Sequence, residues 1–330
     1  MERFGFVGLP NAGKSSLYNA LAGGGALAAP YAFATTDPNV GVAKVPDQRL
    51  EALAAMSNSR NVVHASVQFV DIGGLVEGAS KGEGLGNRFL AHIREVDAVV
   101  YVLRAFQDPD VPGSSDPLEH LRIVELELCL ADLETLEKQL ERKKKQAKID
   151  KGAVAEAAAM SAAYEVLGDG TPLYRSSLSR EHRELLRPWF LLTNRPVLAV
   201  LNIDESQLEA ADEVVAPVQA ELGAGAEVLP VCVQLEAEAA LLDADDRAEM
   251  LEGFGLGEGA LPRFLQAAYH LVGLRTFLTT GDKESRAWTF RAGAKAPEAA
   301  GVIHNDLQKG FTRAEGMRWD DTLGTCSGSK

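Results

Sequence analysis

The sequence predicts an α/β fold with a mostly parallel sheet, interrupted by an inserted pair of antiparallel helices. Short apolar runs recur between helical stretches, and runs that are apolar on both faces are typical of buried strands covered by helices. Strands that alternate with helices favour a parallel sheet built from right-handed crossovers. We expect the strands at Phe4–Gly8, Val67–Asp71, Ala98–Leu103, Val197–Asn202 and Val228–Val233. Arg286–Arg291 is a further candidate strand, in a separate module near the C-terminus.

The first predicted strand leads directly into a glycine-containing loop. Residues 8–15, GLPNAGKS, fit the pattern GxxxxGK[ST] and precede a helical run, Ser16–Leu21. In such a loop, successive backbone N–H groups turn toward phosphate oxygens, and the helix N-terminus adds the positive end of its dipole. The motif predicts that Lys14 pairs with the β- and γ-phosphates of a nucleotide and that the Ser15 hydroxyl binds Mg²⁺.

Two further segments carry groups that a phosphate loop commonly recruits. The sequence DIGG, residues 71–74, closes the second strand, where Asp71 can hold Mg²⁺ through water and the Gly74 N–H can sense the γ-phosphate. Thr35 and Thr36 lie in a loop between the first two strands. A threonine there can complete the Mg²⁺ coordination while the γ-phosphate is present and release it after hydrolysis. The alternative is that both threonines only help to form a turn.

The fourth predicted strand ends in Asn202-Ile203-Asp204-Glu205. Switch GTPases have Asn-Lys-x-Asp at this place, where the Asp accepts hydrogen bonds from guanine and the Lys lies over the ring. Here Ile203 can offer an apolar face to either purine, and the longer Glu205 no longer sits where guanine needs it. Loss of guanine-specific hydrogen bonds lowers guanine preference by orders of magnitude, so the motif favours ATP over GTP. The alternative is that the same residues only cap a helix at Glu205–Ala211, and capping is compatible with base reading.

The region between the third and fourth predicted strands is helical in character. From Leu118 onward, apolar residues recur at spacings of three and four, which is typical of a helix that packs lengthwise on a partner. A second helix-prone stretch, Val154 to Leu167, follows Gly152. The pattern predicts an antiparallel helical hairpin, a short coiled coil, over residues 118–190. The seam of its first helix would consist of Leu126, Cys129, Leu133, Leu136 and Leu140.

A basic segment, residues 137–151, joins the two predicted helices. It holds seven Lys or Arg residues and three acids, a net charge of +4 in a chain whose formal net charge is −14. Two interpretations stay open. One is a solvated hairpin tip, which such charge runs usually are, and the other is a contact with the phosphate backbone of RNA.

The composition restricts the class of protein. The 330 residues are 46% hydrophobic and 24% charged, which favours two or three packed domains over wholesale disorder. The net charge of −14 argues against a binder whose whole surface is basic. No apolar run reaches the roughly 18 residues of a membrane span, and a strand-like run starts too close to Met1 for a signal peptide. We therefore expect a cytoplasmic, monomeric protein without membrane contact.

The cysteines and histidines show no metal spacing. The three cysteines are far apart in the chain, and the six histidines lack the i,i+4 pairing typical of zinc sites. Cys129 and Cys232 fall in a predicted helix seam and a predicted strand, so we expect both to be buried hydrophobes rather than nucleophiles.

Taken together, these segments make the sequence resemble the YchF family, the Obg-like ATPases within the translation-factor class of P-loop GTPases. The resemblance extends over nearly the whole chain, and its two longest blocks are highly specific. The matching stretches are GFVGLPNAGKSSLYNAL (5–21), FATTDPNVGV (33–42), FVDIGGLVEGASKGEGLGNRFLAHIRE (69–95), NIDE (202–205) and RAWTFRAGAKAPEAAGVIHNDLQKGFTRAE (286–315).

The resemblance implies a nucleotide-binding domain, the hairpin insertion and a C-terminal TGS module of β-grasp type. It also implies preference for ATP over GTP and association with ribosomes. If the basic segment 137–151 contacts a phosphate backbone, ribosomal RNA is then the expected partner. The family pattern places Mg²⁺ on Ser15 and Thr35, the first threonine of its pair. Phosphate contact falls on Asn11, Ala12, Gly13, Lys14, Ser15 and Ser16, and base contact on Asn202, Ile203 and Glu205.

Three features bear on turnover and on the C-terminal module. Leu75 follows the DIGG motif where Ras-like enzymes place a water-orienting Gln; the family shares this apolar residue, which implies slow hydrolysis. The loop of residues 105–117 lacks the histidine that some members are thought to use, and the nearest one, His120, looks helical. A potassium ion or a bound partner could supply the missing charge. After Glu315 the chain continues with GMRWDDTLGTCSGSK, so we expect an altered or truncated TGS module that ends in a frayed tail, residues 316–330.

The resulting hypothesis is a Mg²⁺-dependent enzyme that hydrolyses ATP slowly, with Lys14, Thr35 and Gly74 as its catalytic groups and Ser15, Thr35 and Asp71 as its metal contacts. One alternative is an ATP-regulated ribosome- or RNA-binding protein with incidental hydrolysis. A GTPase, which would require Glu205 to act as Asp does, is the third. The predicted domains are the two parts of the nucleotide-binding domain, the hairpin and the C-terminal module, at residues 1–117, 191–273, 118–190 and 274–330 respectively.

Overall fold

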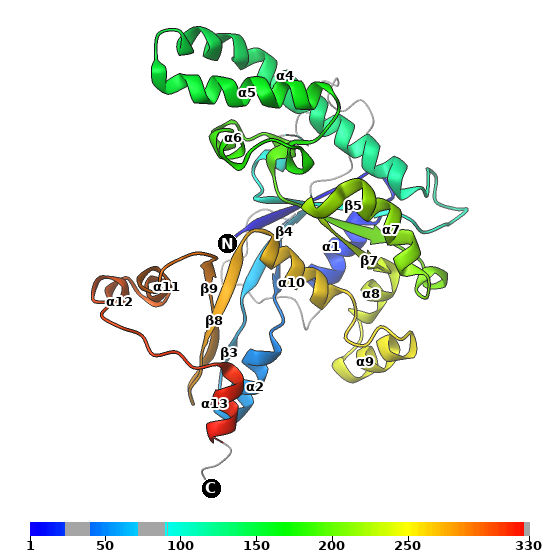
Figure 1. Cartoon of the computed structure of the whole chain (residues 1–330). Helices are drawn as coiled ribbons and strands as arrows, with labels where there is room; N and C mark the ends of the chain where they lie inside the picture. Colours follow the sequence, from blue (N-terminus) through cyan, green and yellow to red (C-terminus); the bar gives the residue numbers. More distant parts are fainter. Residues whose placement is uncertain (24–39, 72–89, 91, 327–330) are drawn as a thin grey trace.

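The computed structural model describes residues 1–23, 40–71, 90 and 92–326, and its centre is a six-stranded sheet (Figure 1). Neighbouring strands are parallel except for β2 and β4, in the order β2-β4-β1-β5-β6-β7. This sheet confirms the predicted α/β class and all five predicted strands. The strands are β1 Arg3–Val7, β2 Val40–Lys44, β4 Ser66–Asp71, β5 Ala98–Arg104, β6 Val197–Asn202 and β7 Glu227–Val231.

Strand β2 was not predicted, and its residues explain why. It lies at the edge of the sheet, antiparallel to β4, with alternating buried and half-buried positions. The buried positions are Gly41 and Ala43, whose small side chains give almost no hydrophobic signal. An edge strand of this kind depends on pairing with its neighbour more than on its own propensity.

Helices cover both faces of the sheet, as buried parallel strands require. Successive residues of β5 point to opposite faces, so Val100 packs in one apolar cluster and Tyr101 in the other. The first cluster includes Leu17 of α1 (Lys14–Gly23) and Phe264 of α10 (Leu261–Leu271). The second includes Leu121 of the hairpin's first helix together with residues of α7 (Ala211–Leu222). Each large apolar side chain buried here contributes about 1.5–3 kcal/mol.

The helical hairpin is present and projects from the sheet domain (Figure 1). Its first helix, α4, spans Pro117–Ala147 and begins at the N-cap Asp116, whose side chain accepts a hydrogen bond from the Leu118 N–H. Its second helix, α5, spans Val154–Gly168 after a short 3₁₀ turn. A separate apolar cluster joins the two helices, with Cys129, Leu136 and Leu140 facing Met160, Ala163 and Leu167.

The predicted seam of the first hairpin helix is wrong at one residue, Leu126. Leu126 is 51% exposed, whereas Val124 and Leu128 are fully buried against the sheet domain. The reason is that α4 changes partner along its length. Its first half packs on the sheet and only its second half packs on α5, so no single heptad seam runs through both.

Cys129 and Cys232 are both buried, as predicted. Burial, with the nearby carboxylates Asp132 and Glu125, raises the pKa of the Cys129 thiol to about 12, which keeps it protonated and unreactive.

None of the described helices combines the length and apolarity that a membrane crossing needs.

The remaining helices of the sheet domain and the hairpin are short. Glu205–Gln207 forms a 3₁₀ turn after β6, so the predicted helix at 205–211 begins later than expected, at Ala211. The other helices are α2 Gln48–Met56, α6 Arg180–Leu185, α8 Val233–Ala239 and α9 Ala244–Gly253, and 3₁₀ turns lie at Leu173–Arg175, Arg187–Trp189, Leu192–Asn194 and Gly223–Gly225.

A second, three-stranded sheet forms the C-terminal module. Strands β8 (Leu274–Thr279) and β9 (Ser285–Arg291) pair antiparallel, and the short strand β3 (Val62–Val63) pairs parallel with β9. Only β9 had been predicted. Helices α11 (Ala296–Ile303) and α12 (Asn305–Lys309) follow β9.

The prediction of a frayed tail over residues 316–330 is wrong for Trp319–Cys326, which form helix α13 in contact with α2. Asp320 and Asp321 lie in the first turn of this helix, where negative charge stabilises the helix dipole. Residues 327–330 lie outside the described part of the chain.

The first segment of the chain contributes to both sheets. Strand β3 pairs in the C-terminal sheet, and α2 contacts both β9 and α13, although both elements come from the predicted first part of the nucleotide-binding domain. The division at residues 117, 190 and 273 stays a prediction.

Candidate nucleotide-binding site

The phosphate motif forms a tight loop between the end of β1 and the start of α1. Asn11 and Gly13 both have left-handed backbones, with φ values of 62° and 97°. A Cβ atom at Gly13 would lie only 2.2 Å from the Asn202 amide nitrogen, so this position requires glycine for space as well as for conformation. The loop is thereby closely fitted to the end of β6.

Lys14 is the first residue of α1 and only 6% exposed. Its Nζ donates a hydrogen bond to the Leu9 carbonyl oxygen at 2.7 Å, which bends the side chain back over its own loop. Ser15 and Ser16 follow in the first turn and are exposed. A lysine ammonium and the free N–H groups of a helix start together form the kind of site that binds phosphate.

Asn202 fastens this loop to the rest of the sheet edge. Its Nδ2 donates to the Ala12 carbonyl at 3.0 Å, and its Oδ1 accepts from the Val233 N–H at 3.3 Å. Its main-chain oxygen also accepts hydrogen bonds from the N–H groups of Ala105 and Phe106. Asn202 is 5% exposed, so its side chain positions the phosphate loop between two neighbouring loops.

The other predicted base-contact residues differ in accessibility. Ile203 is 2% exposed and packs in the cluster on one face of the sheet. Glu205 is exposed, in the 3₁₀ turn that Asp204 caps through a hydrogen bond from the Ser206 N–H to Asp204 Oδ1 at 2.9 Å. The capping interpretation is confirmed, with Asp204 as the capping residue. Of the three predicted contacts, Glu205 offers the most accessible side chain in this structure.

A buried arginine that the sequence analysis overlooked organises the adjoining loop. Arg104 ends β5, is 2% exposed, and donates hydrogen bonds to the carbonyl oxygens of Phe106, Asp108, Val111 and Pro112 at 3.1–3.3 Å. Its guanidinium also lies 4.6 Å from the centre of the Phe106 ring. The signal in the sequence is a single charge at the end of an otherwise apolar strand.

This arginine-centred loop reaches the phosphate loop, because the Asn11 Nδ2 donates to the Pro112 carbonyl at 3.4 Å. His120, the histidine nearest to the loop in sequence, is 2% exposed, and its Nε2 lies 2.8 Å from the Ser114 carbonyl oxygen. Burial lowers the pKa of His120, which favours the neutral ring. Its contact with Ser114 gives it a structural role at the start of α4.

Several predicted residues lie wholly or partly outside the described chain. Thr35, Gly74 and Leu75 are not among the described residues, and the side chain of Asp71 is not described. The backbone of Asp71 pairs with Phe6 at the end of β4, two residues before the phosphate loop begins. Within the described ranges no group of three His, Cys, Asp or Glu side chains forms a metal site. The predicted donors, a serine hydroxyl and a carboxylate beside a phosphate loop, are the oxygen ligands that Mg²⁺ prefers.

Two family models match the chain. One, described as a 50S ribosome-binding GTPase, matches residues 3–151. The other, YchF-GTPase_C, is described as a protein of unknown function (DUF933) and matches residues 274–330, the C-terminal module.

Curated relatives and a solved structure cover almost the whole chain. The Ribosome-binding ATPase YchF of Bacillus subtilis is 44% identical over 336 residues, covering 99% of this chain and 92% of the relative. The protein of the same name from Escherichia coli O157:H7 is 41% identical, covering 97% and 89%. The structure of the Schizosaccharomyces pombe YchF GTPase is 32% identical, with a TM-score of 0.86 over 98% of this chain and 90% of that one. With this identity over nearly its full length, and with both sheets and the hairpin in place, the chain belongs to the YchF family.

Proposed function

We propose that this protein binds ATP with Mg²⁺ at the phosphate loop and hydrolyses it slowly, as a molecular switch. The observation that carries the proposal is the complete GLPNAGKS loop, held in its left-handed turns and fastened by Asn202 at the carboxyl end of a parallel sheet. The carboxyl ends of the strands are where doubly wound sheets bind their ligands. The names of the curated relatives, Ribosome-binding ATPase, support the same reaction.

The chain's own groups would act by positioning and by neutralising charge. Lys14 would exchange its bond to the Leu9 carbonyl for one to the β- and γ-phosphates, and the first N–H groups of α1 would hold the same oxygens. Ser15, Thr35 and Asp71 would hold Mg²⁺, which would neutralise charge on the phosphates. Gly74 would sense the γ-phosphate through its N–H.

Replacement of the phosphate-loop lysine tests the proposal. In Lys14→Ala we expect ATP hydrolysis to fall by at least about 100-fold, because the main positive charge on the transferred phosphate is lost. Lys309→Ala, an exposed lysine of α12, is the matched control and should hydrolyse ATP at the wild-type rate. Unchanged turnover in Lys14→Ala would overturn the assignment.

Nucleotide choice needs its own measurement, since the printed names of the relatives include both ATPase and GTPase. We propose that ATP is preferred because Glu205, the exposed residue at the predicted base site, replaces the aspartate that guanine requires. Parallel titrations of ATP and GTP with wild type and Glu205→Asp would show tighter ATP binding in the wild type. Tighter GTP binding by the wild type would contradict this part of the proposal.

A second candidate function is ATP-regulated binding to ribosomes or ribosomal RNA, with little hydrolysis. It is favoured by the basic segment 137–151, in which Arg142, Lys145, Lys148 and Lys151 are exposed and have no ion-pair partner among the described residues. Exposed cations of this kind suit a phosphate backbone. ATP binding without phosphate release in the titrations above would select this function over hydrolysis.

We further propose a monomeric protein that acts in the cytoplasm, where ribosomes would be its partners. Light scattering coupled to size exclusion would give the mass of one 35.3 kDa chain.

We also propose that a potassium ion supplies positive charge during hydrolysis, because the loop of residues 105–117 contains no histidine. Faster phosphate release in K⁺ than in Na⁺ would support this role of potassium.

A further inference from the structure

A cavity among the described residues lies at the opposite end of the sheet from the phosphate loop. It has a volume of about 990 Å³ and includes Glu2, Asp97 and Pro196, which directly precede β1, β5 and β6. Three separate parts of the chain line this half-open cavity: the N-terminus, the base of the hairpin around α6, and the C-terminal module through Arg291. Sites for small ligands have about this volume and often form where such parts meet.

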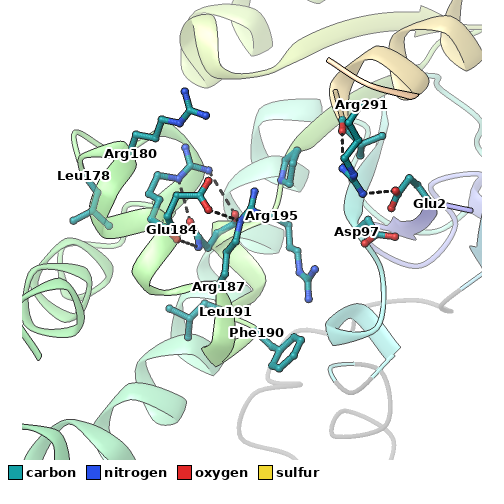
Figure 2. Close-up of a pocket in the computed structure, with 14 residues that line it drawn as sticks. Glu2, Asp97, Leu178, Arg180, Glu184, Arg187, Phe190, Leu191, Arg195 and Arg291 are labelled. Carbon is teal, nitrogen blue, oxygen red and sulfur yellow. Dashed lines mark hydrogen bonds and ion pairs between the residues drawn. The ribbon is translucent and has the colours of Figure 1, made fainter. Parts of the chain in front are cut away.

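Positive charge dominates the lining of this cavity. Five arginines face three acids, a difference of +2, and Figure 2 shows the Arg291–Glu2 pair on the side opposite Arg180 and Glu184. The acids are already engaged: Glu2 pairs with Arg291, Glu184 with Arg187 at 3.0 Å, and Asp97 accepts from the Arg3 N–H at 2.9 Å. The five arginines are Arg180, Arg183, Arg187, Arg195 and Arg291.

Two of these arginines retain donors for a ligand. The Arg180 side chain is exposed and makes no hydrogen bond or ion pair with any described residue. Arg195 is half-buried and commits one of the five N–H donors of its guanidinium, to the Arg94 carbonyl oxygen at 2.7 Å. Burial lowers the pKa of Arg195 without discharging it, so an anion in the cavity would stabilise a charge that is partly removed from water.

An aromatic ring lies beside these charges. Phe190 is 56% exposed, and its backbone is left-handed with φ at 50°, a conformation that costs a bulky residue about 1–2 kcal/mol. The Arg195 guanidinium carbon lies 5.9 Å from the centre of the Phe190 ring. A flat apolar surface next to guanidinium groups suits a ligand that combines a planar base with phosphates.

We propose that this cavity is a second nucleotide site, which binds a nucleoside triphosphate through Arg180 and Arg195 with the base against Phe190. Guanidinium groups bind phosphate oxygens in pairs of hydrogen bonds, which gives both affinity and orientation. A single nucleotide fits a half-open cavity of about 990 Å³, whereas an RNA chain would need a surface that continues beyond it. The proposal is independent of hydrolysis at the phosphate loop.

Such a ligand would connect the base of the hairpin with the C-terminal module. Arg180, Arg187 and Phe190 belong to the hairpin base, and Arg291 belongs to β9. Occupancy would therefore favour the arrangement of these two parts seen here, and a ligand that binds only the folded arrangement stabilises it. The site would allow nucleotide concentration to affect the hairpin without passing through the phosphate loop.

Binding stoichiometry tests the proposal, with ATP as the probe in isothermal titration calorimetry and equilibrium dialysis. We expect two ATP equivalents per wild-type chain and one in Lys14→Ala. Arg180→Glu should weaken the remaining equivalent at least about tenfold, since one charge-assisted contact is replaced by repulsion. Phe190→Gly should also weaken it while relieving the left-handed backbone, so this variant is expected to fold.

Arg60→Glu is the control, because Arg60 is exposed, lies outside the cavity and has no side-chain partner among the described residues. It should bind ATP as the wild type does. A single ATP equivalent that disappears in Lys14→Ala would overturn the second site and leave the proposed function intact. Two equivalents that both survive Lys14→Ala would instead contradict the proposed function.

A titration with RNA tests the remaining possibility, that the cavity is part of an RNA-binding surface. A single-stranded RNA of twelve nucleotides is titrated into the wild type and into Arg180→Glu. RNA binding that is lost in Arg180→Glu, in a protein that takes up only one ATP equivalent, would overturn the small-ligand assignment. RNA binding that is the same in both proteins, together with two ATP equivalents, supports it.

Discussion

The two ends of the inserted hairpin use charge in opposite ways. At its base, Glu125 of α4 is 2% exposed and accepts hydrogen bonds from the Tyr174 hydroxyl at 2.5 Å and from Arg175 at 2.6 and 3.0 Å. At its tip, Lys145 and Lys148 are exposed and have no ion-pair partner among the described residues. Charge at the base therefore joins α4 to the segment after α5, and Arg175 extends this cluster to Glu221 of α7 in the sheet domain. Charge at the tip is left for solvent or a partner.

The difference follows from burial. A charge taken out of water is costly unless it is paired and hydrogen-bonded, so each buried group at the base depends on its neighbours. Burial disfavours the positive charge of Arg175, but its hydrogen bonds to Glu125 and the negative charge of Glu125 together raise the pKa of Arg175. Burial, with the neighbouring Tyr101 and Glu125, raises the pKa of Tyr174 far above its usual value, which keeps its hydroxyl a donor. Exposed pairs are screened and contribute little.

The largest expected effect comes from breaking the cluster at the base. Glu125→Ala would leave the Tyr174 hydroxyl and the Arg175 guanidinium without their shared acceptor. We expect the free energy of unfolding to fall by about 3 kcal/mol, because the buried Tyr174 hydroxyl loses its acceptor and the half-buried Arg175 keeps only the longer of its two ion pairs, at 3.6 Å with Glu221. Urea denaturation followed by circular dichroism gives the value.

Glu134→Ala is the matched control on the same helix. Glu134 pairs with Lys138 at 2.6 Å, but the two side chains are 54% and 67% exposed. Its removal should change the unfolding free energy by no more than about 0.5 kcal/mol. Equal losses in the two variants would mean that burial does not separate the two ends of the hairpin.

A smaller effect, dependent on pH, is expected at Asp132 of α4. Asp132 is fully buried and accepts hydrogen bonds from the Leu192 N–H, the Thr193 N–H and the Thr193 hydroxyl at 2.7–2.8 Å. Burial outweighs these hydrogen bonds and raises the pKa of Asp132 from 3.8 to about 6. Between these values the folded protein holds a proton that the unfolded chain has lost, so raising the pH lowers stability.

The comparison of wild type with Asp132→Asn isolates this group, since carboxylates shared by both proteins cancel. As the pH rises from about 4 to about 6, we expect the wild type to lose on the order of 2–3 kcal/mol of unfolding free energy relative to the variant, with no further relative change above about pH 7. Urea titrations at a series of pH values give this difference. A difference that is constant from pH 4 to 8 would show that Asp132 titrates normally.

The same contrast explains what could be predicted from the sequence. The phosphate loop and the five apolar strands follow from local patterns, which the structure preserves. Arg104 and Asn202 could not be assigned their positioning roles, because their partners are carbonyl oxygens brought near by the fold. Leu126 was misplaced because one helix packs on two different partners, a tertiary property that spacing does not contain.

Within the basic segment, Lys143 is the exception that sharpens the comparison. Its Nζ lies 2.7 Å from Glu156 of α5 and 5.4 Å from the centre of the Trp189 ring, with both side chains of the ion pair mostly buried. We expect Lys143→Ala to lower the unfolding free energy by about 1 kcal/mol, through loss of the ion pair and the cation–π contact. Lys144→Ala should have less than about half this effect, since its pair with Glu141 is exposed and 3.6 Å long. Equal losses of unfolding free energy in the two variants would show that Lys143 contributes no more to stability than an exposed lysine.

The smallest effect on stability is expected at the tip itself, where the largest effect on partner binding should appear. Lys145→Glu with Lys148→Glu should leave the unfolding free energy within about 0.5 kcal/mol, because neither side chain has a partner to lose within the described part of the chain. If the tip contacts ribosomal RNA, each lysine displaces about one counterion. The slope of log affinity for ribosomes against log salt concentration should then fall by about two. An unchanged slope in the double variant would assign ribosome contact to another surface and leave the tip as a solvated end of the hairpin.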